Sequence, residues 1–130
     1  MNYRAIMFAA AAACAVALPS YAHHSFAMFD NSKLIQITGT VREFEYINPH
    51  SWLHVIVPDG GKTVTWSFEM GSVAQLVRDG WNRESVKVGD KMSVSFHPLR
   101  DGSNGGQFRT LVFADGKKLC QGGAGESMCK

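Results

Sequence analysis

Apolar and polar side chains alternate along most of the chain after residue 32, and this two-residue period is typical of β-strands with one buried face. Clusters of Gly, Pro, Asn and Asp separate the alternating segments, as they do at turns. The pattern predicts five strands and a short return strand, at Lys33–Ile47, Ser51–Val57, Thr63–Met70, Lys91–Pro98, Gln107–Phe113 and Lys117–Cys120.

The first of these strands changes phase along its length. Its apolar positions are odd-numbered as far as Val41 but even-numbered at Phe44 and Tyr46. A phase change near Glu43 predicts a β-bulge or strong coiling, since one extra residue moves every later side chain to the other face. Gly39, in the middle of the strand, is suited to a tight bend or a close approach of another backbone.

One segment departs from the strand pattern and predicts a short helix. Ser72 is a favourable N-cap residue, the apolar residues of VAQLVRD recur at helical spacing, and Gly80 is a typical helix end. Three strands, a helix and further strands follow the order of an OB-fold, an all-β, small Greek-key β-barrel with one short helix between strands three and four. A generic β-sandwich is the alternative, but it does not account for the helix or the bent first strand. We expect Trp66 and Trp81 in the core.

The amino-terminal segment has the pattern of a cleavable secretory signal. Arg4 provides a positive charge, Ile6–Leu18 is an apolar run of 13 residues, and Ser20 and Ala22 place small residues before a cleavage site. The run is too short to span a bilayer, which needs about 20 residues. We therefore expect residues 1–22 to be removed and the mature protein, beginning at His23, to be periplasmic or secreted. A lipoprotein signal ending at Cys14 is a weaker alternative, because no Leu leads the box.

The mature chain of 108 residues has the length of one domain, and we expect residues 23–119 to form the barrel and 120–130 a flexible tail. Loss of Arg4 leaves 12 basic against 11 acidic residues, a balance that argues against nucleic acid as a partner. No later apolar stretch could span a membrane. Familiar catalytic motifs such as G-x-S-x-G and H-E-x-x-H are missing, and the sequence therefore favours a binding protein over an enzyme.

Two cysteines remain after signal removal, Cys120 and Cys129. An even pair in an oxidising compartment predicts a disulfide, and the glycine-rich loop between them is flexible enough to allow one. A metal site built on these cysteines is the alternative, but their spacing is wide and no histidine is adjacent.

Several segments together resemble a group of small exported bacterial proteins known only as a domain of unknown function. They are HHSFAMFD at the mature start, TGTVREFEYINPHSWLHV, WSFEMGS before the helix, GWNRESVKVGDKMSV and DGSNGG. The resemblance extends from His23 to about Leu119 and does not include the cysteine-bearing tail. It implies a small periplasmic β-barrel and brings no established activity.

Histidines carry the most specific candidate chemistry. If cleavage follows Ala22, the α-amine and imidazole of His23 can chelate one metal ion, and one further imidazole completes a T-shaped, all-nitrogen set. Such ligands favour Cu(II) among the divalent metals. His24 and His50 are the predicted additional ligands, so we expect a protein that binds a transition metal, most plausibly copper. The alternative for the two leading histidines is the polar, disordered start of a secreted chain.

A second hypothesis needs no metal. It is a binding module for a small organic ligand or a partner protein, with Trp52, Asn48 and His54 as its contact residues. His54 is out of phase with the core-facing residues of its strand and lies about 13 Å along it from His50, too far for both to bind one ion. A copper-dependent oxidase is the third hypothesis.

Two polar residues each have a structural interpretation as well as a functional one. His97, near the end of the fourth strand, is a further potential ligand, although a solvated or hydrogen-bonded strand histidine is the commoner case. Glu69 is a potential metal ligand or general base, and its alternative role is as a charge partner of the helix N-terminus.

Overall fold

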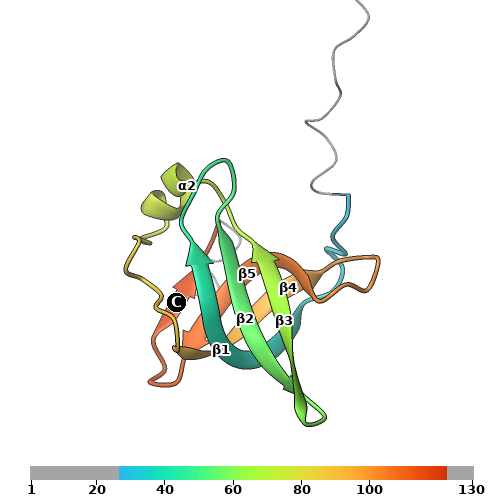
Figure 1. The fold of residues 1–130 in the computed structure, drawn as a ribbon. Coiled ribbons are helices and arrows are strands. Elements are labelled where there is room, and N and C mark those ends of the chain that lie inside the picture. Colours follow the sequence, from blue (N-terminus) through green and yellow to red (C-terminus); the bar gives the residue numbers. More distant parts are fainter. Residues whose placement is uncertain (1–26, 123–130) are drawn as a thin grey trace, which may run out of the picture.

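The computed structural model describes residues 27–122, which form a small β-barrel with one short helix (Figure 1). The predicted signal, His23, His24 and Cys129 lie outside the described residues. Within residues 27–122 no helix has the length and apolar character needed to cross a membrane. The elements in chain order are β1 (Ile35–Glu45), β2 (Trp52–Asp59), β3 (Lys62–Glu69), α2 (Val73–Arg78), β4 (Lys91–Pro98), β5 (Gly105–Phe113) and β6 (Lys118–Cys120).

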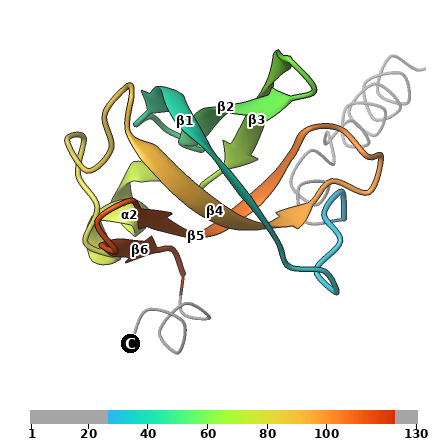
Figure 2. The same ribbon diagram turned by 90° about the horizontal axis from the view of Figure 1, so that it is seen from below.

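Five of the strands close into a barrel, which confirms the predicted OB-like fold and the place of its helix. Neighbouring strands follow the order β3-β2-β1-β4-β5-β6, and an additional parallel pairing of β3 with β5 joins the two ends of the barrel. Viewed from below, the sheet curls around on itself while β6 extends it beside β5 (Figure 2). The glycines of the DGSNGG segment permit the closure, because a side chain at Gly105 would collide with the Ser67 carbonyl and one at Gly106 with the His97 carbonyl.

The predicted irregularity of the first strand is confirmed. The β1–β2 register shifts between Val41 and Glu43, which is where the apolar pattern changes phase. The amino-terminal half of β1 pairs with β4 and its carboxyl-terminal half with β2, so one bent strand belongs to both sides of the barrel. At Gly39 an added Cβ would lie 2.5 Å from the Ile56 carbonyl oxygen, so the strands approach closely there and need a glycine.

The core fills the barrel and extends beneath the helix. Its fully buried large side chains include Phe68, Phe96 and Phe108, with Phe68 and Phe96 ring centroids 4.7 Å apart. Trp81 is buried as predicted, and its indole N–H donates to the Cys120 carbonyl at 2.7 Å. Trp66 is only partly buried and packs at the edge of the core, on the face that the alternation of its strand indicated.

The folded body continues past the predicted end of the barrel at Leu119. Cys120 is the last residue of β6, and Gln121 is buried with only 7% of its surface exposed. Gln121 accepts a hydrogen bond from the Gly71 N–H at 2.9 Å, which holds the segment against the start of α2. The part of the predicted tail that the structure describes is therefore ordered by a tertiary contact. Residues 123–130 lie outside the described part.

Candidate functional site

His50 is the predicted ligand that the structure describes, and it precedes a firmly held residue. Ser51 is fully buried; its N–H donates to the Gly71 carbonyl at 3.0 Å, and its own carbonyl accepts from the Met70 N–H at 2.9 Å. The Ser51 hydroxyl also donates to the Ile47 carbonyl at 3.0 Å, closing the turn. The backbone at His50 is thus fixed to the segment that joins β3 to α2.

The His50 ring is oriented by two acceptors. Its Nδ1 lies 2.9 Å from Glu69 Oε1 and 3.2 Å from the Met70 carbonyl oxygen. A carboxylate and a carbonyl can only accept, so Nδ1 must carry the proton. In the neutral ring Nε2 then holds the lone pair, and it has no hydrogen-bond partner among the residues that the structure describes. A carboxylate–histidine pair of this kind is how proteins usually orient a metal-binding imidazole.

A cavity of about 190 Å³, lined by both polar and apolar residues, lies beside this pair. Residues from β3, α2, β5 and the chain after β6 line it, together with Phe29 from the segment before β1. The His50 side chain is 46% exposed whereas Glu69 is 15% exposed, so the histidine lies nearer to solvent and the carboxylate further in. The complete lining is Phe29, His50, Glu69, Met70, Gly71, Gln75, Gln107, Arg109, Gln121 and Gly122.

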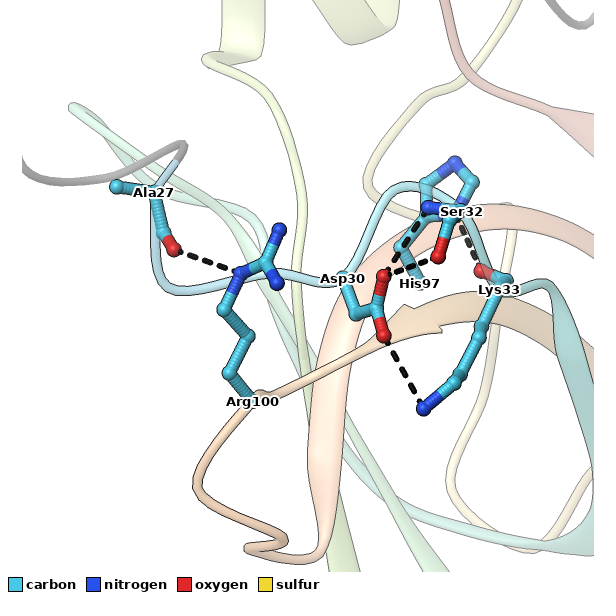
Figure 3. Close-up of polar contacts among 6 residues, drawn as sticks. All are labelled: Ala27, Asp30, Ser32, Lys33, His97 and Arg100. Atoms are coloured by element: carbon cyan, nitrogen blue, oxygen red, sulfur yellow. Dashed lines mark hydrogen bonds and ion pairs between the residues drawn. The ribbon is translucent and has the colours of Figure 1, made fainter.

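The segment before β1 is fixed to the barrel by backbone contacts. Phe29 is 3% exposed and pairs with Leu99, while the Arg100 N–H donates to the Met28 carbonyl at 2.9 Å. Figure 3 shows the Arg100 side chain reaching Ala27, with Nε 3.1 Å from the carbonyl oxygen. The chain that leads back toward His23 and His24 is therefore held in place from Ala27 onward.

Asp30 and His97 complete this anchorage (Figure 3). Hydrogen bonds from Ser32 lower the pKa of Asp30 to about 2, and Lys33 makes a smaller contribution in the same direction. His97 Nδ1 lies 2.7 Å from the Lys33 carbonyl oxygen, and this acceptor again requires the proton to be on Nδ1. His97 is thus a hydrogen-bonded strand histidine, which was the commoner of its two expected roles.

The other predicted contact residues lie apart from the cavity lining. Trp52 and His54 stack on the outer face of β2 with ring centroids 6.3 Å apart, and His54 Nδ1 is 2.8 Å from Ser67 Oγ. Asn48 Oδ1 accepts from the Val73 N–H at 3.0 Å, so this side chain helps to cap α2. The structure therefore does not bring Asn48, Trp52 and His54 together with His50 around one hollow.

The described residues contain a possible ligand grouping that the sequence did not indicate. Potential donor atoms of Glu43, Glu45 and His54 lie within 4.8 Å of one another on the outer side of β1 and β2. Glu43 is exposed, and the nearest approach of Glu45 to His54 Nε2 is 3.8 Å. Because acidic groups often gather on exposed strands without a metal, this grouping carries no functional assignment.

The predicted disulfide is described only in part. Cys120 is disulfide-bonded, whereas Cys129 lies outside the described residues. The pairing of Cys120 with Cys129 therefore stays a prediction.

Fold and site together define a small closed β-barrel with a cavity of mixed polar and apolar lining beside its helix. Residues 11–108 match the profile of the Family of unknown function (DUF6152), and because the match extends over well more than half of the sequence, the chain belongs to this family. The motif resemblance is thereby confirmed. Arg109, Gln121 and Gly122, which line the cavity, lie beyond the matched range. Neither the curated proteins nor the solved structures contain a significant match.

Proposed function

We propose that this chain is an exported, periplasmic, non-enzymatic protein that binds a transition metal, most plausibly copper, at its processed amino terminus. In this proposal the α-amine and imidazole of His23 chelate the ion, and His24 and His50 are the additional ligands. A set of nitrogen ligands in near-planar geometry suits Cu(II). The role is that of a metal-binding protein, since a chain of this size offers little surface to present a second substrate.

The orientation of His50 is the observation that carries the proposal. Glu69 Oε1 at 2.9 Å from Nδ1 fixes the orientation of the ring and leaves Nε2 as its free donor atom. The ring is about half exposed, so an ion can reach it without removal of a covering side chain. Among the described histidines, His50 alone combines a carboxylate at hydrogen-bond distance from one ring nitrogen with a second ring nitrogen free of contacts.

The place of the amino-terminal segment also supports the proposal. Phe29 and His50 line the same cavity, and the chain is anchored from Ala27 onward. His23 lies four positions before Ala27, and an extended chain of that length spans about 13 Å. The proposal requires this short segment to bring His23 and His24 to the His50 side of the cavity.

The decisive experiment compares two forms of the metal-free protein. One begins at His23 with a free α-amine, as mass spectrometry of the exported protein should establish, and in the other this amine is acetylated. Cu(II) should bind the first at one tight site and the second much more weakly, because acetylation turns the α-amine into an amide nitrogen and leaves no amine to begin the chelate. Electron paramagnetic resonance should show nitrogen couplings in the first complex that are lost or reduced in number in the second.

Three substitutions assign the ligands. His23→Ala should weaken binding most, and His50→Ala should weaken it by at least roughly ten-fold, or about 1.4 kcal/mol. His54→Ala is the matched control, because this histidine also lies on the β2 side of the barrel but its Nδ1 contacts Ser67 and its ring stacks on Trp52. Equal copper affinity of the free and acetylated forms would exclude the amino terminus as a ligand and leave the metal-free binding module as the better hypothesis.

A further inference from the structure

The cavity beside His50 contains more hydrogen-bond donors than its own residues satisfy. Gln75 from α2, Gln107 and Arg109 from β5, and Gln121 after β6 all line it. None of the side-chain nitrogens of these four residues has a hydrogen bond or ion pair within residues 27–122. Gln75, Gln107 and Arg109 are only partly buried, so their donors can be reached from the cavity, and a cavity lined by them suits a ligand that accepts hydrogen bonds.

Gln121 is the most informative of these residues because its amide orientation is fixed. Its Oε1 accepts from the Gly71 N–H at 2.9 Å, and a backbone N–H can only donate, so the oxygen and nitrogen of the amide cannot be exchanged. The side chain is nine-tenths buried, with 7% of the residue exposed. Its Nε2 is therefore a pre-oriented donor, carried on a largely buried side chain that lines the cavity.

Arg109 adds an unneutralised positive charge. Arg109 as a residue is partly buried, and its guanidinium has no carboxylate partner among the described residues. Gly122 lies beside the guanidinium. An ideal Cβ at this glycine would be 4.0 Å from Arg109 Nη1 and 3.7 Å from Gln75 Nε2. The two nitrogens thus flank one point at the cavity edge, and the glycine leaves that point open.

Glu69 also lines the cavity but forms no ion pair with this guanidinium within the described residues. Its Oε1 is 2.9 Å from His50 Nδ1, so the negative charge lies on the His50 side and an oxyanion has to bind on the Arg109 side. An anion binds best where a positive charge and oriented hydrogen-bond donors surround it. The planar guanidinium of an arginine suits an oxyanion with two coplanar oxygens.

From this arrangement we propose that the cavity binds a small oxyanion, either an organic carboxylate or an inorganic oxyanion, through Arg109, Gln121 and Gln75. The volume of about 190 Å³ limits the ligand to a few non-hydrogen atoms, below the usual size of a drug-binding pocket at roughly 300 Å³ or more. This site goes beyond the metal proposal: it needs neither a metal ion nor a free amino terminus, although its wall includes His50.

The test uses metal-free mature protein whose His23 α-amine is acetylated, so that the chelating amine is blocked. Acetate, malonate, phosphate and sulfate are titrated separately, against sodium chloride at matched ionic strength, which controls for screening. Nuclear magnetic resonance follows the side-chain amide signals of Gln121 and Gln75 and the Arg109 Nε–H signal. We expect saturable shifts with a dissociation constant on the order of 1 mM or tighter.

Two variants and a control locate the site. Arg109→Gln removes the charge, and Gln121→Glu keeps an oxygen for the Gly71 N–H while replacing the donor with a negative oxygen. Each should weaken binding roughly ten-fold or more, as expected for a charged hydrogen bond. Arg78→Gln removes an exposed charge at the end of α2 that does not line the cavity, and it should leave binding unchanged. Backbone spectra report whether each variant is folded, and if Arg109→Gln is not, Gln121→Glu decides.

The four anions distinguish the ligand source. Saturation by the carboxylates alone identifies an organic acid, and saturation by phosphate or sulfate alone identifies an inorganic oxyanion; either supports the proposal. Shifts that match those of chloride overturn it. Tight binding that survives both Arg109→Gln and Gln121→Glu also overturns it, because the anion is then bound elsewhere. Loss of copper binding would not affect any of these outcomes.

Discussion

Glu69 offers the sharpest test of the metal proposal, because it acts on the ion only through His50. Its Oε1 lies 2.9 Å from His50 Nδ1, and its side chain is 15% exposed, so solvent only weakly screens the contact. Loss of such a supporting carboxylate generally weakens metal binding by roughly 10- to 100-fold, which corresponds to about 1.4–2.7 kcal/mol. We therefore expect Glu69→Ala to weaken Cu(II) binding within that range.

The conservative variant Glu69→Gln should lose less copper affinity than Glu69→Ala. Glu69→Gln keeps an oxygen that can accept from His50 Nδ1 but removes the negative charge, and the Met70 carbonyl at 3.2 Å still fixes the protonated nitrogen. We expect less than a roughly ten-fold loss of copper affinity for this variant. The graded series, wild type above Gln above Ala, separates electrostatic support from simple orientation of the ring.

The assay is a competition titration of Cu(II) against a chelator of known affinity, with unfolding temperature measured for each variant. Glu45→Ala is the matched control, because its carboxylate lies 3.8 Å from His54 Nε2 instead of beside His50. Wild-type copper affinity in a folded Glu69→Ala protein would refute the role of His50. A larger loss of copper affinity in Glu45→Ala than in Glu69→Ala would indicate that the metal binds on the outer face of β1 and β2.

Three further predictions concern the fold. Gly39→Ala should destabilise the protein by about 1–3 kcal/mol in chemical denaturation, because its Cβ would lie 2.5 Å from the Ile56 carbonyl; an unchanged midpoint would contradict this close approach. The Asp30 carboxyl should titrate near pH 2, and Ser32→Ala should move its pKa back toward 3.8, as carbon-detected resonance can measure. Since the folded pKa lies below the unfolded one, this contribution to stability is complete above pH 3.8 and is lost as the pH falls through about 2. Thiol titration of denatured, unreduced mature protein should find no free thiol, and two free thiols would exclude the Cys120–Cys129 bridge.

The elements of the barrel could be predicted because their signals are local. Period-two alternation marked the strands to within a few residues, and the phase change between Val41 and Phe44 marked the bulge where the register shifts. Ser72 does cap α2, its Oγ accepting from the Gln75 N–H at 3.3 Å. Strand ends were less accurate, since the ladder continues or stops according to the partner strand, as at Asp59 and Lys62.

The site could be predicted only in part, because its contacts join distant segments. His50 was a candidate by residue type, but its pairing with Glu69 depends on the register that places Trp52 opposite Glu69. Arg109 alternates with buried neighbours and looks outward-facing in sequence, so nothing local marks it as a cavity residue. Gln121 follows the last strand among glycines and resembles a tail; its burial depends on the Gly71 N–H, a tertiary partner that no pattern reveals.

The seam of the barrel makes ligand binding a question of stability as well as recognition. Only three residue pairs join β3 to β5, from Ser67 with Gly105 to Glu69 with Gln107. The last of these pairs contributes both of its members to the cavity, one from each side of the seam. A ligand that contacts both strands stabilises their pairing, because separation of β3 from β5 would require its release. Amide hydrogen exchange along this short joint should therefore slow when the cavity is filled, and the seam itself becomes a reporter of what the protein binds.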